Sequence, residues 1–217
     1  MKQLEKQNNP RREPVQERSK RRVSAILDVA AQLVQEVGVD GLTTSEIARR
    51  AGIKLASLYR YFPNKNAIIK SLAERHFVNL RPYLQEFLEN FDLETGFDRM
   101  IDAYARFYRS EPGYMELWSG IQANPELNQL DLEDLEQNVS IIVTRAGDMF
   151  PHLDEDTLKA VAMVTTRSCG AVLRLAMTAE PKQAEIMLEE LKHMVKSYIM
   201  SRMKSRPEFA EAAKAQP

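Results

Sequence analysis

Side chains that can donate hydrogen bonds to anionic oxygens are concentrated between residues 43 and 65, in the stretch TTSEIARRAGIKLASLYRYFPNK. The stretch combines hydroxyl groups, two phenols and several cations within a few turns of chain. Groups of these types are the usual donors to the phosphates and base edges of nucleic acids. The stretch therefore predicts a surface that lies against DNA.

Two short helices around a glycine turn are expected to position these side chains. Thr43 has the residue type of a helix N-cap, and Glu46, three positions later, can complete a reciprocal capping pair. Gly52 supplies the left-handed backbone conformation that a tight corner between two helices needs. A second helix is then expected from about residue 55 to residue 62.

These residues resemble the TetR family of bacterial transcriptional regulators. The family pattern joins a Thr-capped helix, an Ile-Ala pair, a glycine turn, a Leu-Tyr-x-Tyr-Phe run and a short basic step. The matching positions here are Thr43, Thr44, Ile47, Ala48, Ala51, Gly52, Leu58, Tyr59, Arg60, Tyr61, Phe62, Asn64 and Lys65. The resemblance implies a homodimer that reads a palindromic double-stranded DNA operator.

The resemblance also implies roles for nine side chains of this stretch. Four match positions that contact phosphates in the family, namely Thr44, Tyr59, Tyr61 and Lys65. Five occupy the start and outer face of the recognition helix, expected in the major groove, namely Lys54, Leu55, Ala56, Ser57 and Arg60. The family usually has serine at position 54 and glycine at position 56, so the operator preference of this protein is expected to depend on that segment. Core packing is the open alternative for Tyr61 and Leu55.

The charge distribution supports a division of labour along the chain. Residues 1–81 hold 16 Lys and Arg against 8 Asp and Glu, a net charge of +8, whereas the remaining residues hold 14 against 23, a net charge of −9. A basic third on an acidic body is typical of a DNA-binding head attached to a body with another task.

The apolar periodicity predicts an all-α fold of about nine helices. The expected organisation is a disordered basic arm at 1–14, a helix-turn-helix DNA-binding domain at 15–63, a C-terminal ligand-binding and dimerisation domain at 64–206, and a flexible tail at 207–217. Pro82 is expected to kink or break the long helix that begins near Asn64. Asp154 is expected to N-cap a helix in the C-terminal part.

Two helices near the C-terminus carry narrow apolar seams that suit a four-helix dimer interface, where the resemblance also places one. The seam positions are Ala160, Val164, Ser168, Ala171 and Leu175 on the first helix and Leu188, Leu191, Val195 and Tyr198 on the second. Gly170 predicts close packing against a neighbouring helix, because glycine costs a helix ~1 kcal/mol relative to alanine. Closure of the monomer's own core is the open alternative for both helices.

The resemblance further implies a small-molecule effector in the C-terminal domain, of apolar or amphipathic character. The candidate pocket residues are Phe77, Tyr83, Phe87, Tyr104, Phe107, Tyr108, Trp118, Ile121, Met163 and Arg167. Core packing is the alternative for each aromatic residue. Arg167 and Arg174 share a helix face, and their pairing with Glu185, Glu189 or Glu190 is favoured over recognition of an anionic ligand.

Other classes of protein find little support. The lone Cys169 fits a reducing cytoplasm, and His76, His152 and His193 lack metal-ligand spacing. We find no nucleophile–histidine arrangement, phosphate loop, signal peptide or apolar run near ~20 residues. We expect a cytoplasmic, dimeric transcriptional repressor that is not an enzyme and uses no cofactor or metal. A regulator without an inducer (an activator or a partner-controlled protein) and a helical interaction scaffold remain alternatives.

Overall fold

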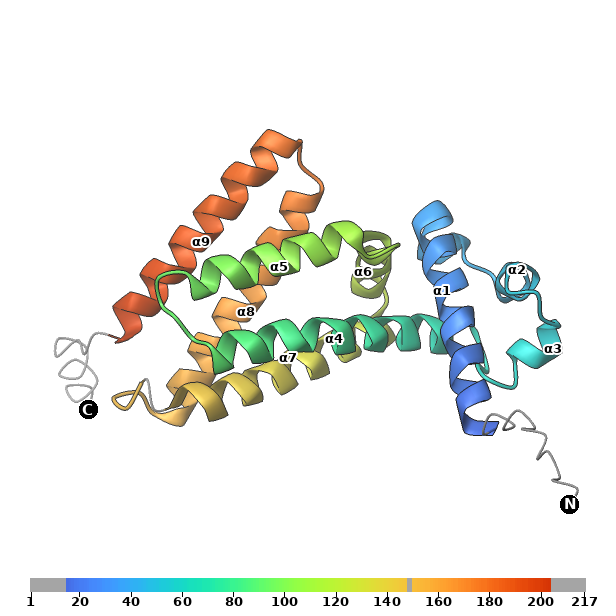
Figure 1. Ribbon diagram of the computed structural model, residues 1–217, viewed down its shortest axis with the longest axis horizontal. Helices are drawn as coiled ribbons and strands as arrows, with labels where there is room; N and C mark the ends of the chain where they lie inside the picture. The colour runs from blue at the N-terminus through green and yellow to red at the C-terminus, as the bar shows by residue number, and fades with distance from the viewer. Residues whose placement is uncertain (1–14, 148–149, 204–217) are drawn as a thin grey trace, which may run out of the picture.

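The computed structural model describes residues 15–147 and 150–203, and helices account for nearly all of them (Figure 1). The helices of this part are α1 (Val15–Gly41), α2 (Thr44–Arg50), α3 (Leu55–Leu58), α4 (Lys65–Glu89), α5 (Gly96–Ser110), α6 (Tyr114–Ala123), α7 (Pro125–Ala146), α8 (Glu155–Met177) and α9 (Pro181–Met203). For the residues that the structure describes, the predicted all-α fold of about nine helices is confirmed. The arm predicted at 1–14, the tail at 207–217 and the end of the last helix near residue 206 lie outside the described residues.

The helices form a small head and a larger body (Figure 1). Helices α1, α2 and α3 lie together at one end, and α4 runs from this head along α7 into the body. Helix α6 packs mainly on α1 and α7, while α5, α8 and α9 pack against one another at the far end. Head and body are therefore joined through α4 and α6.

The caps predicted at Thr43 and Asp154 and the left-handed turn predicted at Gly52 are confirmed, and Asn64 provides a further cap. The Oγ1 atom of Thr43 accepts a hydrogen bond from the Glu46 backbone N–H at 3.3 Å, and Gly52 has φ +64°. Asn64 caps α4 by accepting from the Ala67 N–H at 2.9 Å, and Asp154 caps α8 in the same way. Such caps satisfy backbone donors that would otherwise be unpaired.

One half of the expected capping pair is wrong. The Glu46 carboxylate is engaged by neighbouring guanidinium groups, since Arg49 Nε donates at 2.8 Å and Arg50 Nε donates at 2.9 Å. Because charge-assisted hydrogen bonds are stronger than one to a neutral amide, the carboxylate is turned toward the arginines.

The recognition helix is shorter than the sequence predicts. Helix α3 ends at Leu58, and the chain continues in a tight turn in which the Tyr61 N–H donates to the Leu58 carbonyl at 2.9 Å. Lys54 makes no side-chain cap, and Pro63 disfavours helical geometry at Phe62. Helix α3 therefore lacks a side-chain cap at its N-terminus and cannot easily extend past Phe62 at its C-terminus.

Pro82 does not break α4, which continues to Glu89. A proline in a helix leaves the carbonyl four residues earlier without its usual donor. That residue is Val78, which is 63% exposed, and Pro82 is exposed too. Water can therefore satisfy the carbonyl on this side of the helix, while the other side stays packed.

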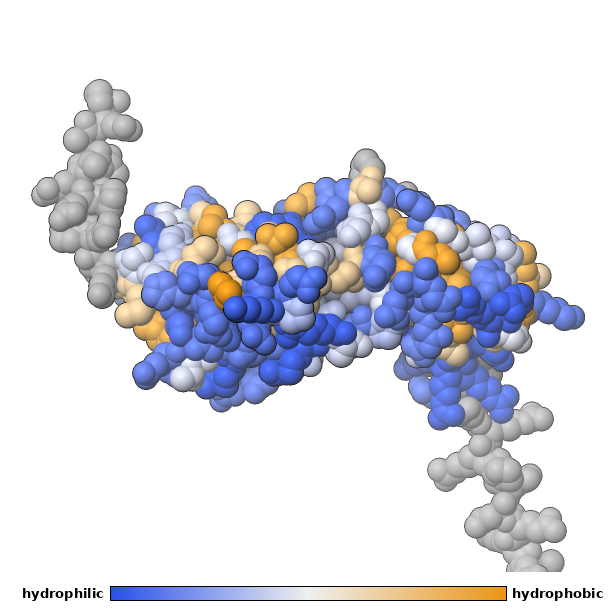
Figure 2. Space-filling view, turned by 90° about the horizontal axis from the view of Figure 1, so that it is seen from above, coloured by the Kyte–Doolittle hydropathy of each residue, from blue (hydrophilic) through white to orange (hydrophobic). Residues whose placement is uncertain are grey.

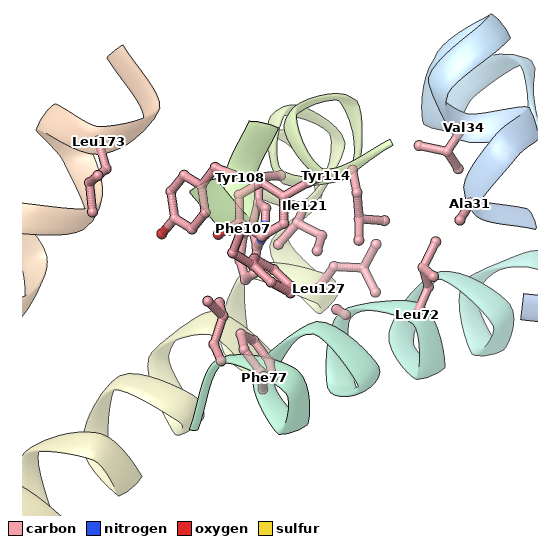
Figure 3. Packing of buried hydrophobic residues seen from close by; sticks show 14 of the residues in the cluster. Ala31, Val34, Leu72, Phe77, Phe107, Tyr108, Tyr114, Ile121, Leu127 and Leu173 are labelled. Carbon is pink, nitrogen blue, oxygen red and sulfur yellow. The ribbon is translucent and has the colours of Figure 1, made fainter. Parts of the chain in front are cut away.

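The hydrophobic core is continuous from the head to the body (Figure 3). Ala31 and Val34 of α1 face Leu72 of α4, and the cluster extends through the α5 and α6 aromatic residues to Leu173 of α8. Outside this core the surface is largely hydrophilic with several apolar patches, as Figure 2 shows for one face.

Helix α8 is the most apolar long helix in the described part of the chain. By length and composition alone it is apolar enough to cross a membrane, with a mean hydropathy of 1.2 over its best window. One face of α8 packs on α5, α7 and α9, and Val164 and Leu175 on another face are exposed. A helix with two apolar faces reaches this hydropathy without needing a lipid environment.

Candidate nucleic-acid interface and ligand cavity

The helix-turn-helix presents most of the predicted DNA contacts on one surface. Leu55, Tyr59 and Tyr61 are exposed by 39%, 46% and 37%. Lys54, Ala56 and Arg60 are exposed as well, and Ser57 is half-buried. Leu58 and Phe62 point inward and are buried. The turn thus separates an inner apolar face from an outer face of hydroxyls, phenols and cations, and neither Leu55 nor Tyr61 is a core residue.

Thr44 and Tyr59, two of the residues predicted to contact phosphates, contact each other. The Thr44 Oγ1 and the Tyr59 hydroxyl lie 3.1 Å apart. Thr44 is the first residue of α2 and Tyr59 is the C-cap of α3. Because the N-terminus of a helix attracts anions, a hydroxyl at this point is well placed for a phosphate oxygen.

Lys65 has a structural role that the sequence did not predict. Its Nζ donates to the carbonyl oxygens of Val39 at 3.2 Å and of Asp40 at 3.3 Å, at the end of α1. An ammonium group has three donors, so one remains for a phosphate. The side chain ties the start of α4 to the end of α1.

One ion pair fixes α2 to α1, and it is joined to a network within α2. Arg50 donates from both terminal nitrogens to the Glu36 carboxylate at 2.7 Å, and from Nε to Glu46. The hydrogen bonds from Arg49 and Arg50 lower the pKa of Glu46 to about 2. Sequence reasoning missed this network, although Glu46, Arg49 and Arg50 stand at the i, i+3 and i+4 positions typical of such pairs.

A cavity of about 180 Å³ lies in the body between α4, α5, α6, α7 and α8. Six of the ten residues predicted for a pocket line it, namely Phe77, Phe87, Tyr104, Tyr108, Trp118 and Arg167. The other four, Tyr83, Phe107, Ile121 and Met163, do not line it. Phe107 and Ile121 are core residues, Tyr83 is half-buried beside Tyr104, and Met163 is 40% exposed.

The cavity wall contains two ion pairs. Arg167 Nη1 lies 2.6 Å from Asp131 Oδ2, and Arg81 Nη2 lies 3.2 Å from Asp134 Oδ1. Burial raises the pKa of Asp134. Pairing of Arg167 with glutamates of α9 is therefore wrong, because α7 supplies the partner. The i, i+3 spacing of the two aspartates could have identified them in the sequence.

Cys169 also lines the cavity and is buried. Burial raises the pKa of its thiol to about 12. A neutral thiol is a poor nucleophile, so Cys169 acts as a small apolar wall residue.

Helix α6 connects the cavity to the head at very short range. A Cβ atom on Gly113 would lie 2.5 Å from the Ala31 carbonyl oxygen, and one on Gly120 would lie 2.6 Å from Val39 Cβ. Trp118 of the same helix lines the cavity. Because of these close contacts, a shift of α6 must also shift the part of α1 that packs against it.

Comparison with known sequences identifies the family. The sequence profile described as "Tetracyclin repressor-like, C-terminal domain" matches residues 92–203. The profile "Bacterial regulatory proteins, tetR family" matches residues 26–72. The chain belongs to the TetR family. This is a family of DNA-binding transcription regulators and not of enzymes.

Similarity to individual proteins supports the assignment of this chain to the TetR family. Tetracycline repressor protein class A from transposon 1721 of Escherichia coli is 45% identical over 51 residues, which is 24% of each chain. The chain thus spans about a quarter of the length of that curated relative. A TetR-family regulator from Streptomyces coelicolor is 26% identical, with a TM-score of 0.62 over 83% of this chain and 98% of that one. A Mesorhizobium loti structure, described as a putative TetR-family transcriptional regulator, has 16% identity and a TM-score of 0.66 over 85% and 98%, which shows the fold alone.

In this TetR-family protein, the apolar seam predicted on α8 faces solvent, whereas the one predicted on α9 does not. On α8, Val164 and Leu175 are exposed by 55% and 58%, Ala160 and Ala171 are exposed, and Ser168 is half-buried.

On α9 the predicted seam faces the monomer core. Leu188, Leu191 and Val195 are at most 6% exposed, and Tyr198 is half-buried. The outward apolar residues of α9 are Ile186, Met194 and Met200. The predicted seam of α9 therefore helps to close the monomer's own core, which was the open alternative for this helix.

Gly170 also differs from its prediction. The side-chain atoms nearest to a Cβ at this position belong to Arg174, at 3.2 Å, and not to another helix. The glycine leaves room for a guanidinium group one turn further along α8.

Proposed function

We propose that this protein is a homodimeric transcriptional repressor that binds a palindromic operator and releases it when a small apolar or amphipathic ligand enters the body. The observation that carries the proposal is the exposed outer face of the helix-turn-helix, where Leu55, Tyr59 and Tyr61 are left uncovered above a fully packed inner face. Exposed aromatic and aliphatic residues beside cations are costly unless a partner covers them. Operator DNA is the partner that this chemistry fits.

The head is proposed to divide its contacts by chemistry. Thr44, Tyr59, Tyr61 and Lys65 would donate to phosphates, which positions the protein. Lys54, Ala56 and Arg60 would face base edges, where a cation can donate to guanine and a methyl group can contact thymine. We place the boundary of this domain at residue 63, before α4.

The dimer is proposed to form through the outward faces of α8 and α9. These faces carry Met163, Val164 and Leu175 on α8 and Ile186, Met194 and Met200 on α9, all at least 40% exposed. Two such helices from each protomer make a four-helix bundle with an apolar centre. A dimer would place two heads on successive half-sites, and cytoplasmic DNA would be their target.

The effector is proposed to act through α6. The cavity is bounded by Trp118 of α6, and Gly113 and Gly120 hold the same helix directly on α1. A ligand that binds better to one position of α6 would favour one placement of the heads. This connection favours an effector-controlled repressor over a regulator without an inducer.

The experiment that tests the proposal measures mass and DNA binding together. Val164→Glu should convert the dimer to monomers in size-exclusion chromatography with light scattering, and should abolish retention of an operator duplex in a gel shift. Val78→Glu is the matched control, since Val78 is 63% exposed on α4, away from the proposed interface. A Val164→Glu variant that stayed dimeric and bound DNA normally would contradict the dimer interface. A wild-type protein that retained no duplex would contradict the function.

A further inference from the structure

The cavity carries one positive charge that no carboxylate neutralises. Arg81 pairs with Asp134, and Arg167 pairs with Asp131. Arg174 also lines the cavity, and within residues 15–147 and 150–203 no carboxylate forms an ion pair with it. The wall therefore has a surplus guanidinium group.

The surplus guanidinium lies against its own helix. Its Nη1 atom is the neighbour nearest to the Cβ position of Gly170, four residues earlier on α8. Side chains on a helix lean toward its N-terminus, so Arg174 extends back over the preceding turn. A larger residue at position 170 would compete for the same space on the cavity wall.

The cavity wall also has an unpartnered hydrogen-bond donor. Trp118 is 3% exposed, and its Nε1 has no hydrogen-bond partner in the described part of the chain. The Tyr114 ring stacks on Tyr108 at 4.1 Å and lies 5.9 Å from the Trp118 ring. The positive charge of Arg174 partly offsets the rise in pKa of both tyrosines, so its guanidinium group lies near their hydroxyl groups. Arg174 and Trp118 thus both lie near Tyr114.

The two tyrosines cannot supply a negative charge. Burial raises the pKa of Tyr108 and raises that of Tyr114 well above its ordinary value. Both remain neutral at neutral pH, because burial is the largest influence on each pKa. This end of the cavity therefore lacks an anionic acceptor.

The rest of the cavity is aromatic and small. Phe77 lies 5.4 Å from Trp118, and Phe87, Phe91 and Phe97 form a second group of rings with centroids 4.9 to 6.0 Å apart. The volume of about 180 Å³ slightly exceeds that of a cavity of roughly 150 Å³ that holds benzene. The space suits one aromatic ring with a short polar substituent.

We propose that the ligand is a small aromatic carboxylate, with its carboxylate on the Arg174 guanidinium and the Trp118 N–H and its ring among the cavity phenylalanines. The proposal rests on the proposed function in so far as this ligand is the effector that releases DNA. Carboxylates accept the two parallel hydrogen bonds that a guanidinium offers. A monoanion would also balance the surplus charge.

The test uses calorimetric titration with three matched probes at constant ionic strength. Phenylacetate carries the anion, phenylacetamide is its neutral analogue, and phenethylamine is a cationic analogue. Wild-type protein should bind phenylacetate at least tenfold more tightly than either of the others. Equal binding of all three, preference for the amide or amine, or binding of none would overturn the proposal.

Variants then locate the carboxylate. Arg174→Gln should weaken phenylacetate binding at least tenfold and remove the preference over the amide, while Arg174→Lys should keep part of that preference. Trp118→Phe should weaken phenylacetate binding severalfold. Arg145→Gln, at an exposed arginine outside the cavity wall, should change nothing. If the Arg174→Gln variant does not fold, the ranking of the three probes by wild-type protein and the effect of Trp118→Phe still test the proposal.

A separate measurement keeps the two proposals distinguishable. Phenylacetate is added to a fluorescent complex of the wild-type protein with operator DNA. Release of DNA supports both proposals. Binding through Arg174 without release leaves the ligand class standing and contradicts the effector role. A protein that binds phenylacetate but no DNA contradicts the repressor function alone.

Discussion

The hydroxyl oxygens of Thr44 and Tyr59 lie 3.1 Å apart, although fifteen positions separate the two residues in the sequence. The contact joins the start of α2 to the end of α3 on the exposed face of the head. One hydroxyl donates to the other, so one proton of the pair is left for a phosphate oxygen. In the proposed complex the two residues would therefore donate to a phosphate as one hydrogen-bonded pair.

Removal of the Tyr59 hydroxyl tests this site. Tyr59→Phe should weaken binding to every duplex by about tenfold, since a hydrogen bond to a charged group contributes about 1.5–3 kcal/mol and 1.4 kcal/mol is tenfold. Fluorescence anisotropy on operator and unrelated duplexes measures the change. Tyr83→Phe, at a half-buried tyrosine of α4, is the control. A loss confined to the operator would assign Tyr59 to base reading.

Lys65→Ala should have two separate effects. Loss of a phosphate contact should lower the slope of log affinity against log salt by about one unit for all sequences. Loss of the bonds to Val39 and Asp40 should also lower the free energy of unfolding by about 1–2 kcal/mol. Lys70→Ala, at an exposed lysine five residues further along α4, should show neither effect. If the slope of log affinity against log salt is unchanged while the free energy of unfolding falls, Lys65 has only a structural role.

Glycine substitutions separate backbone strain from close contact. Gly52 and Gly113 have φ angles of +64° and +69°, but only Gly113 lies against another helix. Gly52→Ala should cost about 1–2 kcal/mol through its left-handed backbone alone. Gly113→Ala should cost about 3 kcal/mol or more, because its Cβ would also collide with α1. Urea unfolding measures both, and equal losses would show that α6 is not held tightly on α1.

His76 should make stability depend on pH. The side chain is fully buried, and burial together with the charge of Arg75 lowers its pKa to about 4. Between pH 6.5 and 4 the unfolded chain binds a proton that the folded chain does not. Stability should therefore fall as pH falls through this window, by up to about 1.4 kcal/mol per pH unit from this residue.

The measurement compares wild type with His76→Phe by urea unfolding at pH 7, 6 and 5. The variant should lose stability less steeply with falling pH, since a phenyl ring in the cluster with Phe107 and Tyr114 takes up no proton. Parallel curves for the two proteins would refute the assignment. Such a result would mean that Glu111, whose Oε1 lies 3.3 Å from Nε2, stabilises the protonated ring after all.

Local chemistry was predictable from the sequence, and long-range packing was not. Thr43, Gly52, Asn64 and Asp154 act within a few residues of themselves, so their types identify the helix ends. Helix α4 continues through Pro82 because the carbonyl group of Val78 can be hydrogen-bonded by water. The exposure of Val78 depends on the tertiary packing of α4, which the local sequence does not reveal.

The choice between helix faces was also beyond the sequence. The period of α9 showed that Leu188 and Leu191 share a stripe, but only the packing of α5 and α8 shows that this stripe is internal. Likewise, the partner of Arg167 comes from α7, 36 positions away. Gly170 signalled a close approach correctly, yet the approaching group was Arg174 of the same helix.

We propose that a dimer of this chain reads a palindromic DNA sequence through α3, and selection of duplexes from a random-sequence library can establish whether it does. The purified wild-type protein should enrich one palindrome, identified by sequencing. Lys54→Ser should change the preferred bases of that palindrome without changing the spacing of its half-sites. Absence of enrichment, or an enriched site without two-fold symmetry, would show that the protein does not read DNA as a symmetric dimer.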